Sequence, residues 1–470
     1  MIVRYGSVVI LEVGKRSSKV TLWSRRKGVV ERFTRRNEPQ RSPLGYPCLD
    51  VAGIEAWLAV CLARCARAAP VSAIIPVAHG AAACVLENGA LSLAPPDYET
   101  DLPDAVRDRY RARRPSFQQT GSPCLPAGLN LGAQLHRLSA LAPRLMRRGT
   151  IITWPQYWAW RLCGVAATEV SSLGCHTDLW LPYEKRPSKL AVDRGWAGRL
   201  APLRKAGDVL GTVSREWQDR CSLPADCAVL CGLHDSAAAL LAMRGSAGMG
   251  TKDQVMLSTG TWFVAMRAAA DGRIISLPAN RDCLINLDVA GRPIPSARFM
   301  GGREAEFLEQ AAEHAINPAA ASRALFAAAR QGIENGVYAL PNFRPGTGPF
   351  PHMTGYWINR PNYQLGRRAA VSLYLALMAD VSLDLIGARG RLVVSGPYAE
   401  DGVFIRALAG LRPKQRVYGL KGFSLCQGAV GLCDPHGPVM LPELVTALPF
   451  SIAQYAAQWH RLSDSVSLAA

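Results

Sequence analysis

Alternating apolar and polar residues near the start of the chain predict a β-meander. Residues 7–13 form a β-branched apolar run, residues 14–18 form a turn, and the strand pattern resumes at 20–23. A third strand is expected at 29–33, after a second turn. The chain therefore opens with an antiparallel sheet.

A helix and a buried strand are predicted next. Apolar residues recur at helical spacing between Val51 and Ala68, and Asp50 can cap the helix that they predict. Residues 72–77 then have the pattern of a buried strand that ends in Ala78-His79-Gly80. Residues 95–126 are rich in proline and arginine and lack a regular period, so we expect an irregular insertion there, lining one side of a cleft.

A second strand-turn-strand unit begins near the middle of the chain. The composition shifts to Ala, Gly and Ser over residues 241–250, and a strand is predicted at 254–257. The turn Ser258-Thr259-Gly260-Thr261 and another strand, at 262–266, follow it. This order repeats the opening of the chain and indicates a duplicated fold. We therefore predict two domains, residues 1–245 and 246–470.

The second half continues with a long helix and a strand-turn-helix unit. Leucine and valine occupy one helical face of residues 368–386, and a strand at 391–394 leads into Ser395-Gly396-Pro397. A glycine-containing turn between a strand and a helix brings backbone N–H groups to a phosphate or nucleotide. A small-residue helix is expected at 425–432.

Size and charge narrow the class of protein. A chain of 470 residues, of which 49% are hydrophobic and 19% charged, suits two globular domains. The net charge of +18 could serve a nucleic acid, but the basic residues are scattered and lack interleaved aromatic residues. We expect no nucleic-acid partner, and interpret the charge as a solvated surface or as steering of anionic ATP.

Cysteine usage and the absence of long apolar runs favour the cytoplasm. Thirteen cysteines is an odd number, and none has the spacing of a metal-binding pair, so reduced thiols are expected. The apolar run at 7–11 is followed by Glu12, unlike a signal peptide. No stretch approaches the ~18–20 apolar residues of a membrane span. We predict a cytoplasmic protein with no membrane partner.

Phosphoryl transfer needs phosphate-cradling turns, a carboxylate for the metal and a base. The first candidate turn offers N–H groups, hydroxyls and cations directly after Glu12, and an ordinary charged hairpin is the alternative. Its members are Gly14, Lys15, Arg16, Ser17 and Ser18. The second candidate turn consists of Thr259, Gly260 and Thr261, and the repeat supports it.

The third candidate is Cys231-Gly-Leu-His-Asp-Ser236, which follows an apolar strand. A turn at the end of a buried strand places His234 and Asp235 at a sheet edge, where ligands gather in open α/β folds. Asp235 is the candidate base for a substrate hydroxyl. It could instead, or in addition, cap the helix that begins at Ser236.

These motifs together resemble the FGGY carbohydrate kinases, and within them the rhamnulokinase and ketose-kinase branch. The resemblance runs over nearly the whole chain, and its number and order of motifs are specific to the family. The motifs are the Glu12-Val-Gly loop, Ala78-His-Gly-Ala-Ala82, Leu125 to Gln134, Trp154-Pro-Gln-Tyr-Trp-Ala-Trp160, Ser172 to Asp178, Gly232-Leu-His-Asp235, Ser258-Thr-Gly-Thr-Trp262, Ser296 to Glu304 and Ser395-Gly-Pro397.

The resemblance implies an α/β fold of two ribonuclease-H-like domains, of the actin, hexokinase and Hsp70 superfamily, around a central cleft. It implies ATP and Mg²⁺ as cofactors, a small sugar as substrate, and a possible homodimer. Asp235 would be the general base, and Glu12 would organise Mg²⁺. The residues near ATP would be the two turns with Arg298, Gly301, Gly302 and Gly396. The residues near the sugar would be His79, Gly80, His234 and Ser236, to which we add Asp97 and Glu99 as carboxylates able to bind hydroxyls.

The chain departs from the family at Glu12, where members usually carry Asp. A side chain longer by one methylene shifts a hydrated octahedral ion that tolerates little distortion. The main prediction is transfer of the ATP γ-phosphate to a ketose or related polyol. A catalytically weakened or inactive sugar-binding homologue is the alternative, and an actin- or Hsp70-like ATPase is a third class. Which sugar and which hydroxyl react, and the oligomeric state, stay open.

Overall fold

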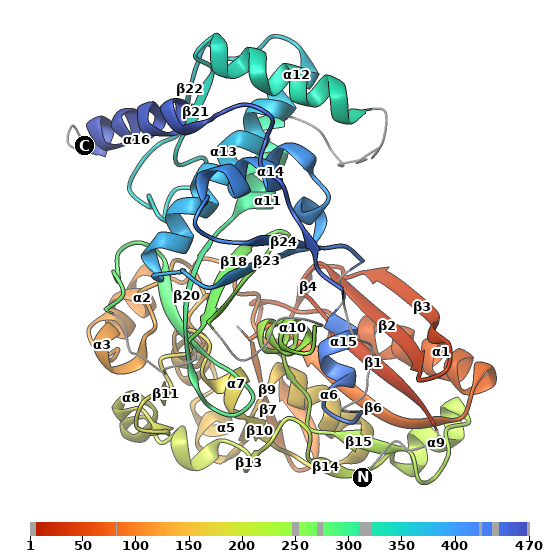
Figure 1. Ribbon diagram of the computed structural model, residues 1–470. Helices are drawn as coiled ribbons and strands as arrows, with labels where there is room; N and C mark the ends of the chain where they lie inside the picture. The colour runs from red at the N-terminus through yellow and green to blue at the C-terminus, as the bar shows by residue number, and fades with distance from the viewer. Residues whose placement is uncertain are drawn as a thin grey trace. The chain divides into compact units, whose positions relative to one another are not determined.

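The computed structural model describes residues 6–80, 82–246, 253–269, 276–309, 321–422, 425–434 and 441–467. Within these residues the chain forms two compact units (Figure 1). The first unit comprises the described residues up to 245 together with 285–293 and 425–434, and the second comprises the others. Each unit is built around a seven-stranded sheet.

The sheet of the first unit contains the predicted meander. Its strands are β1 (Ser7–Val13), β2 (Ser17–Ser24), β3 (Gly28–Arg36), β6 (Val71–Ala78), β14 (Val209–Thr212), β15 (Ala228–Leu230) and β16 (Leu233–His234). β1, β2 and β3 pair antiparallel in chain order, which confirms the prediction. β6 runs parallel to β1, and β15 and β16 both run parallel to β6. The sheet therefore combines an antiparallel half with a parallel half.

The register of the parallel strands aligns their carboxyl ends. Val13 at the end of β1 pairs with Ala78 at the end of β6, and Ala78 also pairs with His234 at the end of β16. The chain therefore leaves three neighbouring strands at the same edge of the sheet. The residues that follow these strand ends are Gly14, His79 and Asp235.

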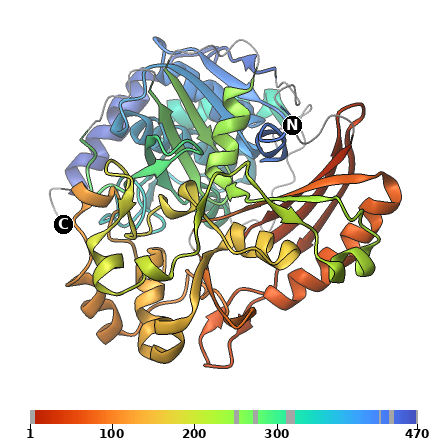
Figure 2. The ribbon, with the colours of Figure 1, turned by 90° about the horizontal axis from the view of Figure 1, so that it is seen from below.

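Helices cover both faces of this sheet. They are α1 (Val51–Ala68), α6 (Trp154–Cys163) and α9 (Arg215–Cys221) on one face, and α10 (Asp235–Arg244) and α15 (Leu425–Val430) on the other. Val9 and Leu11 of β1 share a core with the first group, whereas Val8 and Ile10 share a core with the second. Because alternate residues of a strand face opposite sides, β1 is buried on both faces. In Figure 2 the orange helix α1 lies beside the red strands of the meander.

The predicted insertion contains two short helices, α2 (Asp104–Arg111) and α3 (Phe117–Thr120), between irregular segments. A buried carboxylate anchors it. Asp178 accepts hydrogen bonds from the Tyr110 hydroxyl and from Nε and Nη2 of Arg114, both at 3.0 Å. The Asp178 side chain is fully buried, so this cluster fixes the insertion to the body of the unit.

The remaining elements of the first unit frame the insertion and the sheet edge. They are β4 (Gln40–Arg41), β5 (Pro47–Cys48), β7 (Ala83–Glu87), β8 (Ala90–Leu93), α4 (Leu131–Leu141), α5 (Pro143–Arg148), β9 (Thr150–Thr153), β10 (Thr168–Glu169), α7 (Val170–Leu173), β11 (Trp180–Leu181), β12 (Arg186–Pro187), α8 (Lys189–Asp193) and β13 (Leu203–Arg204). β7, β8 and β9 form a three-stranded antiparallel sheet. Its strand β7 is the next strand after β6 along the chain.

The sheet of the second unit repeats the arrangement of the first. Its strand order is β19-β20-β18-β17-β23-β24-β25. The bounds are β17 (Gln254–Ser258), β18 (Phe263–Ala268), β19 (Cys283–Leu287), β20 (Pro293–Phe299), β23 (Arg391–Ser395), β24 (Val417–Leu420) and β25 (Glu443–Leu444). Residues 285–287 of β19 and Pro293 of β20 are counted with the first unit. β17, β18 and β20 pair antiparallel, and β23 runs parallel to β17, as β6 does to β1. The duplicated fold expected from the sequence is therefore confirmed.

The other described elements of the second unit are α11 (Gly301–Glu309), α12 (Ala321–Glu334), β21 (Tyr338–Leu340), β22 (Tyr356–Ile358), α13 (Gln364–Leu385), α14 (Gly402–Leu411) and α16 (Ala453–Ser467). α13 is the predicted long helix. It begins four residues earlier than expected, because its polar first turn carries no apolar period. Among the described residues, no helix combines the length and the apolar character needed to cross a membrane.

Helices α10 and α15 pack backbone against backbone, and Figure 1 shows them side by side. A Cβ atom at Gly428 of α15 would lie 1.8 Å from the carbonyl oxygen of Ala238 in α10. Glycine is therefore required where the two helices touch. Because α10 begins at Asp235, this contact also supports the sheet edge described above.

We predict that Gly428→Ala destabilises the first unit by about 1–3 kcal/mol, the usual cost of overpacking a core. The added methyl group must push α15 away from α10. Thermal unfolding followed by circular dichroism measures the effect. Gly198→Ala is the matched control, since a Cβ there meets no atom within 4 Å. Equal melting temperatures for the two variants would show that the helices are not in close contact.

Candidate active site

The loop after β1 is a tight turn, and the residue that follows β3, Asn37, holds it in place. Gly14 N donates to Ser17 O at 3.0 Å, and the Asn37 side chain donates to Gly14 O at 2.8 Å. Asn37 also accepts a hydrogen bond from the buried Ser18 hydroxyl at 3.0 Å. The Ser18 side chain therefore faces the protein interior, while Gly14, Lys15 and Ser17 stay partly exposed and Arg16 is exposed. Asn37 directly follows β3 and was not predicted as part of this turn.

Glu12 lies at the end of β1, between Lys19 of β2 and Val77 of β6 in the ladder. Its residue is only 9% exposed. Helix α15 packs on β1. Burial raises the pKa of the Cys426 thiol of α15 to about 12, and the Glu12 carboxylate adds to this shift. The position gives one carboxylate at the sheet edge beside the Gly14 turn.

His79 and Gly80 lie against His234 at the end of the neighbouring strand. A Cβ atom at Gly80 would come within 3.0 Å of the His234 ring and within 1.8 Å of the Cys175 sulfur, so only glycine fits there. Both ring nitrogens of His79 are buried without a hydrogen-bond partner among the described residues. Burial lowers the pKa of His79 to about 3, helped by His234 and Lys15. The result is a neutral imidazole with unused donor and acceptor capacity.

Asp235 is the first residue of α10, and its side chain is 36% exposed. His234 Nε2 lies 3.1 Å from Asp235 Oδ1, and the Ser236 hydroxyl donates to the same oxygen at 3.3 Å. The preceding residue, His234, is the N-cap of the helix. The carboxylate is therefore oriented by two neighbours and still reachable by a small molecule.

Buried polar groups support the turn that carries Asp235. His234 N donates to the Ser171 hydroxyl at 3.2 Å, and that hydroxyl donates to Glu169 at 2.5 Å. Gln156 donates to the carbonyl oxygens of Cys231 and Gly232 at 3.2 and 3.0 Å. Burial raises the pKa of Glu169 to about 7. Glu169 and Ser171 were not predicted, because glutamate is not among the residues preferred as N-caps and α7 is only one turn long.

Lys15 joins the Gly14 turn to the insertion. Its ammonium group lies 2.7 Å from Asp97 Oδ1 and 2.7 Å from Glu99 Oε2. It also lies 4.8 Å from the centre of the Tyr98 ring, which meets the His79 ring edge-on at 5.2 Å. Asp97, Glu99 and Lys15 thus form one ionic cluster beside His79. Tyr98 was not predicted, although it stands between two predicted residues.

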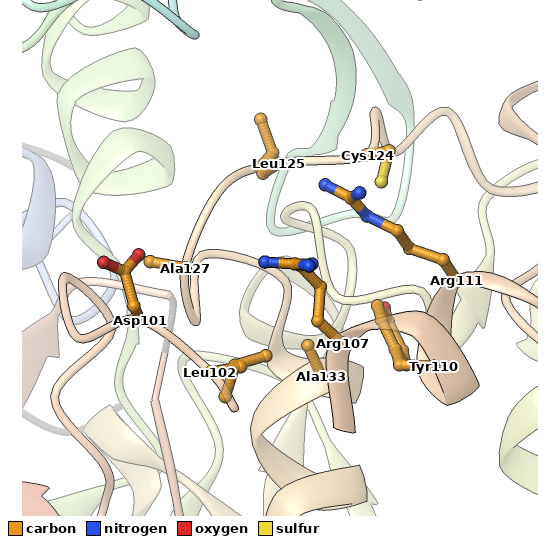
Figure 3. Close-up of a pocket in the computed structure, with 9 residues that line it drawn as sticks. All are labelled: Asp101, Leu102, Arg107, Tyr110, Arg111, Cys124, Leu125, Ala127 and Ala133. Atoms are coloured by element: carbon orange, nitrogen blue, oxygen red, sulfur yellow. The ribbon is translucent and has the colours of Figure 1, made fainter. Parts of the chain in front are cut away.

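The insertion has a small pocket of its own (Figure 3). Arg107 and Arg111 of α2 extend from one wall, and Cys124 and Leu125 form the opposite wall. Tyr110 lines the pocket as well and bonds to the buried Asp178. This wall is therefore fixed by the cluster that anchors the insertion.

In the second unit the predicted turn after β17 lies between two glycines. A Cβ atom at Gly396 would lie 1.9 Å from Thr259 O, and one at Gly302 would lie 2.3 Å from Gly260 O. Thr259 N and its hydroxyl both donate to Ser395 O, at 2.8 and 2.6 Å. The carboxyl ends of β17 and β23 thus meet as those of β1 and β6 do.

Arg298 lies beside this turn, and its guanidinium group contacts two other side chains. Its Nε donates to Asp282 at 2.9 Å, and its guanidinium lies 4.7 Å from the centre of the Trp262 ring. The residue is 6% exposed. Gly301 packs on the Phe263 ring, where a Cβ would come within 2.6 Å. Arg298 therefore stiffens the wall of the turn through the ion pair and the ring contact.

The structure thus gathers the predicted residues into one group in each unit. The first unit joins Glu12, Gly14, Lys15, Arg16, Ser17, His79, Gly80, Asp97, Glu99, His234, Asp235 and Ser236 at one sheet edge, with Ser18 turned inward. The second unit joins Thr259, Gly260, Thr261, Arg298, Gly301, Gly302 and Gly396. The roles of these residues stay predictions.

The donor groups fit a magnesium ion that is shared with phosphates. Within the described part of the chain, no three His, Cys, Asp or Glu side chains gather as a metal site. Magnesium in phosphoryl-transfer sites is usually held by one or two carboxylates, water and the substrate phosphates. The Glu12 carboxylate, which lies beside the Gly14 turn, is compatible with that arrangement.

Comparison with known proteins places this site in a family. Residues 251–438 match the C-terminal domain of the FGGY carbohydrate kinases. The crystal structure of a carbohydrate kinase from Novosphingobium aromaticivorans is 42% identical, with 99% of this chain and 100% of that chain covered and a TM-score of 0.90. A comparison with curated protein sequences gives no match.

More distant structures share the fold. A xylulose kinase from Rhodospirillum rubrum is 19% identical, with 98% of each chain covered and a TM-score of 0.79. A gluconate kinase from Lactobacillus acidophilus is 12% identical, with 98% of this chain and 96% of that chain covered and a TM-score of 0.78.

The fold and these relatives define the chain as a sugar kinase, a phosphotransferase with an alcohol acceptor. It belongs to the FGGY family of carbohydrate kinases, whose members use ATP. The predicted family and the predicted α/β fold of two ribonuclease-H-like domains are confirmed. The rhamnulokinase and ketose-kinase branch stays a prediction.

We predict that His79 stays neutral far below pH 6.5. Its pKa is about 3 in the folded protein, against 6.5 for an ordinary histidine, so an unfolded chain binds an extra proton between these values. The free energy of unfolding therefore falls as the pH drops from 6.5 toward 3, and His79→Gln removes this contribution. NMR of histidine-labelled protein tests the pKa directly, with the variant assigning the signal. A His79 ring that titrates near pH 6.5 would contradict the buried site.

Proposed function

We propose that the protein transfers the γ-phosphate of ATP to a hydroxyl of a ketose or related polyol, with Asp235 as general base. The observation that carries this proposal is the reachable Asp235 carboxylate, next to His79 and the Gly14 turn at one sheet edge. A general base must come within hydrogen-bond reach of the proton that it removes. An exposed, oriented carboxylate at a strand end meets that requirement.

The acceptor is held by the first unit. The neutral His79 ring can both donate and accept a hydrogen bond, which suits a sugar hydroxyl. Gly80 leaves room beside His234, and Ser236 keeps one oxygen of Asp235 oriented. As the hydroxyl oxygen forms its bond to the γ-phosphorus, the bond from that phosphorus to the β–γ bridging oxygen breaks and ADP leaves. The hydroxyl proton passes to Asp235. A carboxylate can accept it late in the loose transition state of phosphoryl transfer.

Each unit offers one turn whose backbone donors suit phosphate oxygens. The turn is Gly14 to Ser17 in the first unit and Thr259 to Thr261 in the second. Backbone N–H groups cradle phosphate oxygens wherever small residues let the chain approach closely. Gly396 and Gly302 keep the second turn in place. Gly396 would lie beside the adenosine of the nucleotide, as the resemblance to the family implies. Glu12 would hold magnesium, which neutralises charge on the transferred phosphate when it is bound.

We predict that Asp235→Asn lowers kcat for sugar phosphorylation by about 10²–10⁴-fold, the usual contribution of a general base. The amide cannot accept the proton, but it keeps the size of the side chain. Release of ADP in a coupled assay with a panel of ketoses measures kcat, and calorimetry with the sugar alone should show binding that is largely retained.

Asp219→Asn is the matched control, because that carboxylate is exposed on α9 and pairs with Arg215. It should retain the wild-type rate. Turnover by Asp235→Asn near the wild-type rate would remove Asp235 from its role. Wild-type protein that binds sugars but releases no ADP would instead support the alternative, a catalytically weakened or inactive sugar-binding homologue. The reason to consider that alternative is Glu12, where the family usually has aspartate.

A further inference from the structure

Lys15, Asp97 and Glu99 form an ionic cluster beside the residues proposed to bind the acceptor. The Lys15 ammonium contacts both carboxylates at 2.7 Å, and its side chain is only 16% exposed. Asp97 is 19% exposed, so the first of these contacts is largely screened from water. Ion pairs in such partly buried positions are stronger than those on an open surface.

This cluster borders the acceptor side through an unbroken row of contacts. Lys15 lies over the Tyr98 ring, the Tyr98 ring meets the His79 ring, and Gly80 touches His234 beside Asp235. Tyr98 is fixed in turn, because Gly128 N donates to Tyr98 O at 3.0 Å. The cluster and the proposed base therefore lie at two ends of one surface.

The formal charge of this surface is negative. The Lys15 ammonium pairs with the carboxylates of Asp97 and Glu99, and a third carboxylate, that of Asp235, lies at the other end of the surface. Arg16 and Glu12, at the same turn, add one positive and one negative charge, so the balance stays negative. The imidazole between them is buried and has no acidic partner among the described residues. An acceptor that carries a carboxylate, such as an aldonic acid, would meet net repulsion here and would have to displace Asp97 or Glu99 from Lys15. A neutral polyol would not.

We propose that Asp97 and Glu99 neutralise Lys15 and thereby make the acceptor site selective for uncharged sugars and against sugar acids. The inference rests on the proposed function and narrows its substrate class. It also gives Asp97 and Glu99 a role different from direct hydroxyl binding. They act as specificity-determining residues because they keep the cation from pairing with a substrate anion.

The test compares kcat/KM for neutral ketoses, such as xylulose and ribulose, with kcat/KM for gluconate. The wild-type protein should prefer the neutral sugars by at least about 100-fold, because bringing like charges together disfavours the wrong ligand. The double variant Asp97→Asn with Glu99→Gln frees Lys15, so the preference should shift at least about tenfold toward gluconate, mainly through KM. Adding Lys15→Met should cancel this shift.

The matched control is Asp104→Asn with Asp108→Asn. It removes the same two charges from the same insertion, but these carboxylates pair with Arg107 and not with Lys15. It should leave the preference unchanged. Glu99→Gln alone serves if the double variant does not fold, because Glu99 is 36% exposed, and it should give a smaller shift in the same direction.

Calorimetric binding of xylulose and gluconate separates this inference from the proposed function. Protein that releases no ADP with any sugar but binds xylulose and not gluconate overturns the kinase proposal and supports the selectivity. Wild-type protein that binds or phosphorylates gluconate as well as the ketoses overturns the selectivity and leaves the kinase intact. An equal shift in the Asp104 and Asp108 control would also overturn it.

Discussion

The site depends on the parallel register of β1, β6 and β16. Hydrogen bonds between these strands pair Val13 with Ala78 and Ala78 with His234, so three chain segments leave the sheet at one level. Slippage of one residue would turn each side chain to the opposite face. Burial of β1 on both faces makes such slippage costly, because its apolar residues fill two cores. The rigid sheet thus places the loops that carry chemistry.

Glycine completes this placement where two backbones touch. Gly80 admits the His234 ring, and Gly428 lets α15 approach the helix that carries Asp235. The second unit uses the same device at Gly302 and Gly396, on either side of the Thr259 turn. In each case a Cβ would approach another atom more closely than contact allows. The glycines in the family motifs are therefore needed for packing, whatever further role they have in binding.

Much of the fold could be predicted because its signals are local. The meander, the helix that Asp50 caps and the repeated strand-turn-strand units follow from periodicity and turn residues within short windows. The partners of Lys15 could not be predicted, since Asp97 comes from an insertion without a regular period. The support of His234 by Ser171 depends on contacts between distant segments. No local pattern indicates that α15, residues 425–430, packs on the first unit. The strands before and after it in the chain, β24 and β25, belong to the second unit.

The account would be tested most directly by a crystal structure with a ketose and a non-hydrolysable ATP analogue bound. It predicts one sugar hydroxyl within about 2.6–3.2 Å of an Asp235 carboxylate oxygen, the reach of a general base. It also predicts that Lys15 remains on Asp97 and Glu99. A sugar bound elsewhere, with the Asp235 carboxylate facing only water, would contradict it.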